Sequence, residues 1–464
     1  MNRRTLALMI VALLVGDITA SFETAMIYAA LKPMNETFGD PIKVGWLVTS
    51  YLLVAAAATA IVGRIGDLFG RKRVMIAMLA VGAIGSLVSA VGESYAVILA
   101  GRAIQGLTGA VLPLAFGIVR EEVRSERVPL ATGIMLMGAT IGTATGLVAG
   151  GLIVDNYGWH AIFYASAALA LVSILLAWAF VPDRRGSTAA RNVDYFDGLI
   201  FIPAVTGLLL YMSNIKLSGW TGSYQLPLAA FSMTCLIVWI RKSLRSANPL
   251  INVRLFADRT IWVSNAITAL YAMSALQITL VFSIILQSPV WTGIGLGVTA
   301  TVSGLVKLPS NISSMLAAPL AGWVTGRRGG RVVMFWGGLM TATGWFMALF
   351  LNQSTTIVAL VLIIISFGTT ITFATAPTMI LAAAPKDRSS EATGMLSVVR
   401  AVFMAIGAQF VSVLLASDTV ARGGADFPSR SAALLTIGII GGLSFGAAAL
   451  SFALPKVQRN NTAS

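Results

Sequence analysis

The chain has very few of the residues that build metal and catalytic sites. Among its 464 residues there is one cysteine, Cys235, and one histidine, His160. A single cysteine cannot form an intramolecular disulfide, and one cysteine with one histidine cannot supply a Cys/His metal cluster. No arrangement of nucleophile and base stands out in the sequence either. We therefore expect no bound metal, no cofactor and no enzymatic activity.

Charged residues are also scarce. They make up 11% of the chain, whereas soluble proteins carry about 25%. Hydrophobic residues account for 57%, the mean hydropathy is +0.85, and apolar stretches recur from one end of the chain to the other. This composition predicts an all-α membrane protein in which no part forms a separate soluble domain.

The apolar stretches set the expected number of membrane spans. A helix needs about 20 apolar residues to cross the hydrocarbon core of a bilayer. Charged, glycine or proline breaks separate fourteen candidate spans in this sequence. Their expected limits are 6–30, 43–63, 74–92, 96–119, 127–155, 160–181, 196–213, 224–240, 260–286, 294–324, 329–350, 356–384, 389–416 and 432–454.

The net charge of +14 suggests a nucleic-acid partner, but the positions of the basic residues favour another explanation. With both termini inside, the predicted outer segments hold only five of the 32 lysines and arginines: Lys32, Lys43, Lys216, Arg422 and Arg430. Most of the others lie in segments predicted to be cytoplasmic, as the positive-inside rule requires. We therefore expect a multi-pass, monomeric protein of the cytoplasmic (inner) membrane, with both termini in the cytoplasm, the lipid bilayer around it and no nucleic-acid partner.

Two sequence patterns occur twice at nearly the same spacing. The segment 63–73 (GRIGDLFGRKR) is echoed at 322–331 (GWVTGRRGGR), 259 positions later. The segment 131–135 (ATGIM) is echoed at 392–396 (ATGML), 261 positions later. A near-constant offset predicts that the chain contains two homologous halves.

The offset also sets the expected domain organisation. Two six-helix halves, 1–182 and 259–464, would flank a segment, 183–258, that carries two inserted helices and their linkers. Parallel repeats of this kind place the substrate site at their interface, near the middle of the bilayer.

Four motifs resemble those of one transporter family. The segment 63–73 is similar to the loop signature of the major facilitator superfamily, and 99–106 (LAGRAIQG) is similar to its second motif. The glycine-rich segment 142–151 resembles the motif of its drug/proton antiporters. The segment 22–31 resembles the first-helix signature of the fourteen-span drug-exporter branch, with Glu23 where aspartate is usual.

Two positions depart from the pattern of that family. Leu147 stands where the antiporter motif has proline, which weakens the assignment to export. Gly326 stands in the second-half loop where the first half has Asp67, a common form of decay in a repeat.

The resemblance implies a mechanical role for the loop 63–73. Gly63 and Gly70 permit a tight turn, and Asp67 can accept hydrogen bonds from the N-terminus of a neighbouring helix. Arg71 and Lys72 can hold the loop at anionic lipid or pair with acids across the halves. We interpret these residues as a latch that closes the cytoplasmic side in one state. The alternative is a solvated basic turn that only sets topology.

Glycines spaced mostly by four residues predict close helix packing. Residues i and i+4 share one face of a helix, so Gly142, Gly146 and Gly150, followed by Gly151, would form a groove for another helix. A further role in preventing leak or setting the direction of transport is a hypothesis.

Five charged residues fall within the expected spans: Asp17, Glu23, Arg102, Lys307 and Arg400. Such residues are costly and mark pathways or ion pairs by default. Glu23 and Arg102 lie at similar expected depth, so they can pair. We predict that Glu23 carries the coupled proton, with Asp17 and Arg102 assisting. Binding of a substrate cation and a static ion pair remain alternatives for Glu23.

The basic residues of the second half allow more than one interpretation. Lys307 either contacts an anionic ligand or compensates the charge of Asp17 or Glu23. Asp17 either takes part in function or pairs structurally with Lys307 or Arg400. For Arg400 a structural role is slightly favoured.

The expected substrate cavity combines polar, charged and bulky side chains from several spans. Aromatic residues and methionines make adaptable apolar pockets. The predicted cavity residues are Glu23, Phe22, Met26, Trp46, Tyr51, Gln105, Asn265, Gln277, Lys307, Asn311 and Arg400.

These observations lead to three hypotheses about function. The first is a proton-coupled antiporter of the multidrug type that exports amphipathic small molecules by alternating access, driven by the proton gradient. The second is a proton symporter or importer of an organic anion or aromatic acid, to which Lys307 and the missing proline at position 147 point. The third, a membrane receptor, is disfavoured because no soluble output domain is visible.

Overall fold

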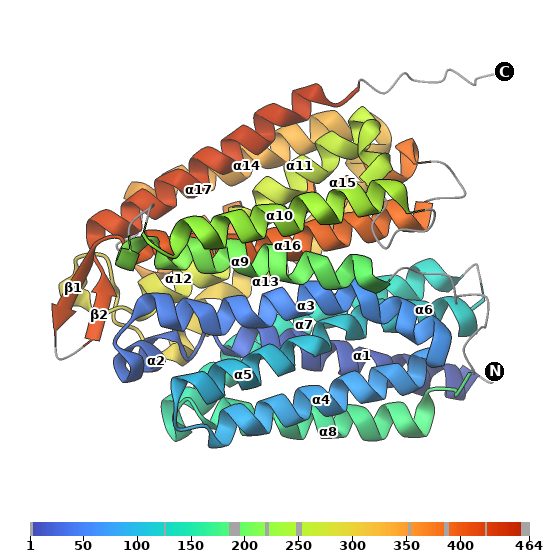
Figure 1. Ribbon diagram of the computed structural model, residues 1–464, viewed down its shortest axis with the longest axis horizontal. Coiled ribbons are helices and arrows are strands. Elements are labelled where there is room, and N and C mark those ends of the chain that lie inside the picture. The colour runs from blue at the N-terminus through green and yellow to red at the C-terminus, as the bar shows by residue number, and fades with distance from the viewer. Residues whose placement is uncertain are drawn as a thin grey trace.

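The computed structural model describes residues 3–124, 127–184, 195–218, 222–246, 253–350, 354–384, 389–422 and 425–455. The tail 456–464 and parts of the expected linkers within 183–258 lie outside these residues. The described helices lie side by side with their long axes roughly parallel (Figure 1).

The two ends of this bundle differ. The termini end contains the start of α1 and the end of α17 (Figure 1). The hairpin end contains the short helix α2 and an antiparallel hairpin of strands β1 and β2, in which Thr419 pairs with Pro428 (Figure 1). The fold is helical as predicted, and the hairpin is the small part that an all-α prediction did not anticipate.

The first group of helices, α1 to α8, is called the N group here. Its elements are α1 (Arg3–Met26), α2 (Leu31–Phe38), α3 (Pro41–Phe69), α4 (Arg71–Val91), α5 (Tyr95–Gln105), η1 (Gly106–Ala110), α6 (Val111–Glu122), α7 (Val128–Tyr157) and α8 (Ala161–Phe180). Two further helices follow, α9 (Tyr195–Ser218) and α10 (Gln225–Arg245).

The later helices, α11 to α17, are called the C group. After η4 (Val253–Ala257), the elements are α11 (Arg259–Met273), η5 (Ala275–Gln277), α12 (Ile278–Gln287), η6 (Val290–Thr292), α13 (Ala300–Arg328), α14 (Gly330–Phe350), α15 (Thr355–Ala383), α16 (Ser389–Leu415), β1 (Thr419–Arg422), β2 (Ala425–Pro428), α17 (Arg430–Leu450) and η8 (Ser451–Ala453).

Within the described residues, twelve helices are long and apolar enough to cross a membrane. The predicted count of fourteen is therefore not confirmed. The two expected spans that are missing from the twelve are α9 and α13, which have 24 and 29 residues. In α13 the polar residues, among them Lys307 and Asn311, lower the mean hydropathy.

Helix ends in this chain are capped by short polar side chains. Asp40 accepts hydrogen bonds from the first turn of α3, Asp258 from that of α11, and Ser354 from that of α15. Capping is important here because lipid cannot satisfy unpaired backbone groups. Between α3 and α4 the chain turns at Gly70, whose φ of 95° favours glycine because it has no Cβ.

Two of the membrane-length helices are interrupted. In the segment 95–122, the α-helix changes to a 3-10 helix at η1. In the segment 259–287, the helix breaks at Ser274 and continues as α12 after η5. The side chain of Gln277 donates to the main-chain oxygens of Ala272 (2.8 Å) and Met404 (3.1 Å). The first contact satisfies a carbonyl at the break, and the second joins the break to α16.

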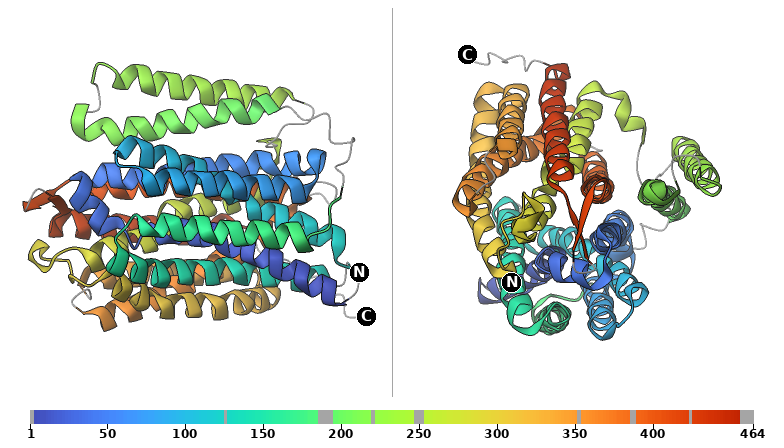
Figure 2. Two further views of the ribbon diagram at one scale, coloured as in Figure 1. Left: turned by 90° about the horizontal axis from the view of Figure 1, so that it is seen from below. Right: turned by 90° about the vertical axis from the view of Figure 1, so that its left-hand side faces the viewer.

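The N and C groups meet along two pairs of long helices. Helix α7 packs against α13, and α3 packs against α16. Figure 2 shows the two groups end-on, with the blue to teal helices of the N group below the yellow to red helices of the C group. The helices α9 and α10 pack on each other at the periphery, and α9 also contacts α3 and α16 (Figure 2).

Both helix pairs are in close contact near the hairpin end. A Cβ at Gly151 of α7 would lie 2.7 Å from the main chain of Ala300, and a Cβ at Gly45 of α3 would overlap the side chain of Ser412. In the second pair Thr49 also donates to Gln409 at 3.0 Å. These contacts fix the distance between the two groups at that end.

Towards the termini end the same helices are further from other parts of the protein. Cβ atoms built on Gly63, Gly133, Gly322 and Gly394 would meet no atom within 4 Å. These glycines belong to α3, α7, α13 and α16, the four helices that join the groups. The groups are therefore packed together at the hairpin end and separate towards the termini end.

Helix α7 has glycine on the face that meets α1. A Cβ at Gly142 would lie 2.7 Å from the main-chain oxygen of Ile18, and one at Gly146 would lie 2.9 Å from that of Phe22. Gly150 meets the main chain of Met26. Small residues permit this backbone approach, which provides much of the packing energy between helices in lipid.

We expect Gly142→Ala to destabilise the protein, because the added methyl group would collide with α1. Overpacking of this kind costs about 1–3 kcal/mol. The matched control is Gly133→Ala in the same helix, which gains a methyl group in open space and a better helix former. Thermal unfolding in detergent should show a lower midpoint for Gly142→Ala and an unchanged or higher one for the control. Equal midpoints would contradict the observed α1–α7 contact.

Candidate functional site

The carboxyl group of Glu23 lies in a pocket inside the N group. Its side chain, on α1, is fully buried. One carboxyl oxygen accepts a hydrogen bond from Ser166 Oγ of α8 at 2.9 Å, and the other accepts from Thr108 Oγ1 of η1 at 2.5 Å. A hydroxyl can donate to a carboxylate or accept from a protonated carboxyl group. The pocket therefore suits both forms of the glutamate.

Arg102 of α5 lies beside this pocket. Its guanidinium donates to the main-chain oxygens of Glu23 (3.1 Å) and Leu47 (3.0 Å), and to the side chain of Gln105. It also lies over the ring of Tyr51, 4.5 Å from the ring centre. The structure thus brings Glu23 and Arg102 together, as their expected depth suggested, but the arginine holds the main chain of Glu23 while hydroxyls hold its carboxyl group.

The sequence-based prediction missed the hydroxyl residues of this pocket. Gln105 donates to Ser86 Oγ at 2.8 Å and to Ser166 Oγ at 3.1 Å, so a connected network runs from Arg102 to the carboxyl group of Glu23. All of these side chains are fully buried. Only their polarity within apolar spans could have indicated them, and many serines and threonines in such spans merely bond to their own helix.

Asp17 lies on the face of α1 that meets α7. It is 2% exposed, and its Oδ2 atom has no hydrogen-bond partner within the described residues. A Cβ at Gly138 of α7 would lie 3.1 Å from this atom. Asp17 is paired with neither Lys307 nor Arg400, the two partners considered for a structural role.

Lys307 lies inside the C group. It is 4% exposed, and its ammonium group donates to the hydroxyls of Ser283 on α12 and Ser303 on its own helix. Next to it is a cavity of about 120 Å³. Asn311, one turn further along α13, lines the same cavity.

The remaining polar residues of the predicted cavity lie elsewhere in the C group. Arg400 is half-buried, with its guanidinium 5.2 Å from the ring centre of Phe373. Asn265 donates to the main chain of its own helix at 2.8 Å, and Gln277 caps the break described above.

The apolar residues of the predicted cavity belong to the packing between helices. Phe22 and Met26 are buried in the core where α1 meets α7, and Trp46 is half-buried on α3. Of the predicted cavity residues, Lys307 and Asn311 are the two that line the 120 Å³ cavity. The structure therefore separates the residues around Glu23 from those around Lys307.

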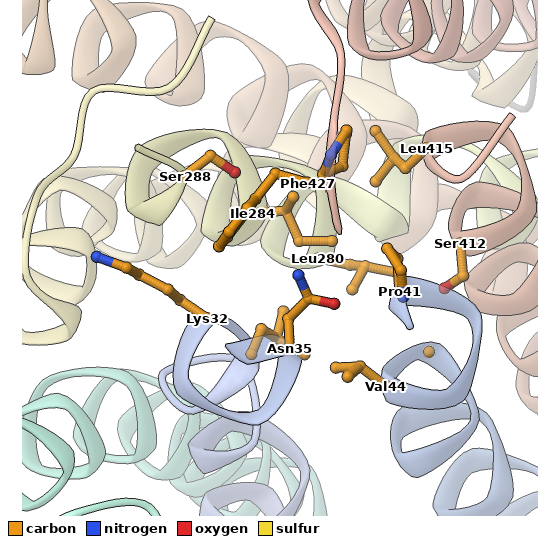
Figure 3. A pocket seen from close by; sticks show the side chains of 13 residues that line it. Lys32, Asn35, Pro41, Val44, Leu280, Ile284, Ser288, Ser412, Leu415 and Phe427 are labelled. Carbon is orange, nitrogen blue, oxygen red and sulfur yellow. The ribbon is translucent and has the colours of Figure 1, made fainter. Parts of the chain in front are cut away.

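A second, smaller pocket lies at the hairpin end between the groups (Figure 3). It has a volume of about 40 Å³ and a mostly apolar lining. In Figure 3, Asn35 and Val44 of the N group face Leu280 and Phe427 of the C group. Asn35 donates to the main-chain oxygen of Asp426 at 2.5 Å. Helix α2 and the hairpin thus fasten the two groups together at this end.

The predicted latch residues are bonded within the N group. Arg71 contacts Asp67 at 2.7 Å and Glu121 of α6 at 3.1 Å. Lys72 donates to the main-chain oxygen of Trp178 in α8 at 2.8 Å. At the termini end, where the groups separate, this loop is fastened to its own side.

A family model, Major Facilitator Superfamily, matches residues 13–408. The chain belongs to this superfamily. The resemblance inferred from the sequence motifs is thereby confirmed, and the protein is a multi-pass membrane transporter.

Named relatives support a place among the drug-efflux members of the superfamily. Multidrug resistance protein Stp of Mycobacterium tuberculosis (strain CDC 1551 / Oshkosh) is 28% identical over 432 residues, which cover 89% of this chain and 76% of that protein. The tetracenomycin C resistance and export protein of Streptomyces glaucescens is 24% identical over 425 residues, covering 91% and 77%.

A solved transporter structure has a similar fold. The crystal structure of the POT family transporter PepTSo matches with a TM-score of 0.68 at 14% identity, over 96% of this chain and 97% of that one. At this identity the likeness concerns the fold alone.

At the hairpin end of this superfamily member, an acid of the N group caps a helix of the C group. One carboxylate oxygen of Asp155 accepts from the main-chain N–H of Ala300 at 3.1 Å. The other accepts from the N–H and the hydroxyl of Thr301 at 2.8 Å and 2.5 Å. The first N–H groups of a helix carry partial positive charge, so the contact stabilises α7 against α13.

We expect Asp155→Asn to loosen the hairpin end. Ser412, buried against Gly45 in the other helix pair, is replaced by cysteine in a Cys235→Ser background to report opening. Loss of an exposed anion at a helix N-terminus costs about 0.3–1 kcal/mol, so labelling by a membrane-impermeant maleimide should speed up about two- to fivefold.

The matched control is Glu93→Gln, an exposed acid at the same end. High salt should reduce the difference in labelling rate between Asp155→Asn and the unaltered protein, because it screens the charge of Asp155. Equal labelling rates in both variants would show that Asp155 does not hold the groups together.

Proposed function

We propose that the protein is a proton-coupled antiporter that exports amphipathic small molecules by alternating access. The relatives named for multidrug resistance and for resistance and export support this direction of transport. The observation that carries the coupling is the pocket of Glu23, a carboxyl group held by hydroxyls that serve both its charged and its protonated form.

In this proposal Glu23 takes up a proton from the outside and releases it to the cytoplasm. Arg102 keeps the main chain of α1 in place through Glu23 O, and Gln105 orients Ser166. A cation fixed beside a carboxylate would lower its pKa, so the group would stay charged after it had released its proton. Hydroxyl partners allow the group to be either protonated or charged, so its state can change when the helices move.

Asp17 is proposed as a second participant. It lies six residues nearer the termini end than Glu23 on the same helix, and its Oδ2 atom has no hydrogen-bond partner within the described residues. A buried acceptor of this kind is costly unless another state or a ligand satisfies it. We assign it the release of the proton, or contact with a cationic group of the substrate.

Alternating access is proposed to use the two ends of the bundle in turn. In the observed conformation the groups are packed at the hairpin end through Asn35 and Asp155 and are separate at the termini end. In the opposite state, the loop with Asp67, Arg71 and Lys72 would exchange its bonds within the N group for contacts with the C group. These residues then act as the latch.

The proposed topology has fourteen spans. Helix α13 contacts α7 and α15, and α9 contacts α3 and α16, so both would lie at the same depth as their neighbours. The N and C groups are proposed to be homologous halves, 1–182 and 259–464, with 183–258 inserted. The basic residues of the predicted inner loops support placing the termini end in the cytoplasm, in a monomer of the inner membrane.

Uptake of an organic anion, the second hypothesis, gains no support from the names of these relatives. Leu147, which weakened the export assignment, packs its main chain against Gly304 of the C group. Its place in this contact gives no reason to prefer uptake.

We expect Glu23→Gln to abolish transport driven by a pH gradient. Purified protein in liposomes is supplied with ethidium as test substrate, and its accumulation is followed under an imposed pH gradient. Glutamine keeps the size and hydrogen-bonding capacity of the side chain but cannot carry the proton. Exchange of labelled against unlabelled ethidium at equal pH should persist, because it needs no net proton movement.

The control is Glu93→Gln, which should accumulate ethidium as the unaltered protein does. Size-exclusion chromatography checks that both variants fold. Accumulation by a folded Glu23→Gln variant at the unaltered rate would exclude Glu23 as the coupling residue.

A further inference from the structure

We propose that Lys307 and Asn311 form a subsite for the anionic group of the exported molecule, a carboxylate or phenolate attached to an apolar body. This inference rests on the proposed function and names part of its substrate class. It follows from three observations: a buried cation with neutral partners, a cavity beside it, and an unpaired amide donor in the same cavity.

The first observation is the surroundings of the ammonium group of Lys307. It donates to Ser283 Oγ and to Ser303 Oγ, the latter at 3.2 Å, and both serines are fully buried. These partners are neutral, so they accept hydrogen bonds without compensating the charge. A cation at membrane depth is costly unless an anion accompanies it.

Among the acids of 253–455 whose side chains the structure describes, none forms an ion pair with this lysine: these are Asp258, Asp418 and Asp426. Asp258 caps the start of α11, and Asp418 and Asp426 belong to the hairpin end, where they bond to serines and to the hairpin. In the N group, the carboxyl group of Glu23 is enclosed by α8 and η1, and Asp17 lies against α7. The missing negative charge is therefore best supplied by a ligand.

The second observation is the cavity of about 120 Å³ next to Lys307. Its walls come from α12, α13 and α15 of the C group and from α7 of the N group. The lining combines hydroxyl groups, such as that of Ser366, with apolar side chains, among them those of Leu147, Leu276 and Leu362. A lining that offers both kinds of contact suits an amphipathic molecule.

The third observation concerns Asn311, four residues after Lys307 and hence on the same face of α13. Its Nδ2 atom is buried and has no hydrogen-bond partner within the described residues. A carboxylate offers two oxygens, one for the ammonium group and one for this amide. Helix α12 also begins beside the cavity, and the N-terminus of a helix favours negative charge.

The position of the subsite suits a transporter. Leu147 lines the cavity from the N group, whereas the other lining residues belong to the C group. An occupant would therefore contact both groups, and its binding would depend on how they are arranged. Substrate sites at the interface of two repeats have this property.

The test uses a pair of probes that differ mainly in charge, 1-naphthylacetate and 1-naphthylacetamide. Their affinities are measured by titration calorimetry on the purified full chain in lipid nanodiscs. The unaltered protein should prefer the acetate. Lys307→Met keeps the length of the side chain without its charge and should weaken acetate binding about ten- to a hundredfold, with little effect on the amide. Lys307→Arg should retain part of the preference.

The matched control is Lys43→Met, an exposed lysine at the hairpin end, which should bind both probes as the unaltered protein does. Equal affinity of the unaltered protein for both probes would overturn the inference, as would an equal loss of both in Lys307→Met. Displacement of the acetate by millimolar inorganic phosphate would also overturn it, because the site would then take inorganic anions. A melting curve for Lys307→Met confirms that it is folded.

Transport of ethidium under a pH gradient separates this inference from the proposed function. If the unaltered protein transports ethidium but does not prefer the acetate, the anion subsite is wrong and the antiporter proposal stands. If it prefers the acetate through Lys307 but moves neither probe nor ethidium under the gradient, the antiporter proposal is wrong and the subsite stands.

Discussion

The structure depends on how closely the backbone of α7 can approach its two neighbours. Apolar surface gives helices in lipid little reason to associate, so close packing of small residues has to supply the attraction. Gly142 and Gly146 let α7 approach the main chain of α1. Further along α7, Gly151 lets this helix approach α13. Gly304 of α13 likewise lies against the main chain of Leu147 in α7. Helix α7 therefore connects the helix that holds the buried acids to the helix that holds the buried lysine.

Both buried charged sites are built from the same kind of partner. Glu23 is held by the hydroxyls of Thr108 and Ser166, and Lys307 by those of Ser283 and Ser303. A salt bridge between an acid and a base would satisfy both groups but would fix their charges in every state. Hydroxyls solvate a charged group and tolerate its neutral or ligand-bound form equally well. In the proposed cycle, the separation of Glu23 from Lys307 would leave the first free to exchange a proton and the second free to exchange a ligand.

Much of the helical framework was predictable because span length and hydropathy are properties of short stretches of sequence. The short helix α2 and the hairpin after α16 were not predictable in this way. Both are short and polar, and their positions depend on contacts with the opposite group. The predicted count of fourteen spans was not confirmed for a related reason. The polar residues of α13 that line the cavity, such as Lys307, are also the ones that lower its mean hydropathy below that of a membrane span.

The burial of Glu23, Arg102 and Lys307 was predictable from the sequence, but their neighbours were predictable only in part. Depth along a helix can be counted at about 1.5 Å per residue, and this placed Glu23 beside Arg102. Rotation about the helix axis and the choice of neighbour cannot be counted in this way. The glycines of α7 illustrate the difference: Gly150 and Gly151 are adjacent in sequence, but they point about 100° apart, and one meets α1 while the other meets α13.

Leu147 bears on how the pocket of Glu23 and the cavity of Lys307 would be coupled in the proposed cycle. A proline at this position would remove a backbone N–H and bend α7 near its middle. With leucine, α7 runs as one helix from Val128 to Tyr157, past Asp17 of α1 on one side and the Lys307 cavity on the other. A displacement of α1 that accompanies protonation would move this helix as a unit. It would change the wall that Leu147 contributes to the cavity together with the cap that Asp155 places on α13. In the proposed cycle, the proton and the anionic group are then coupled through the position of α7, without competing for one shared side chain.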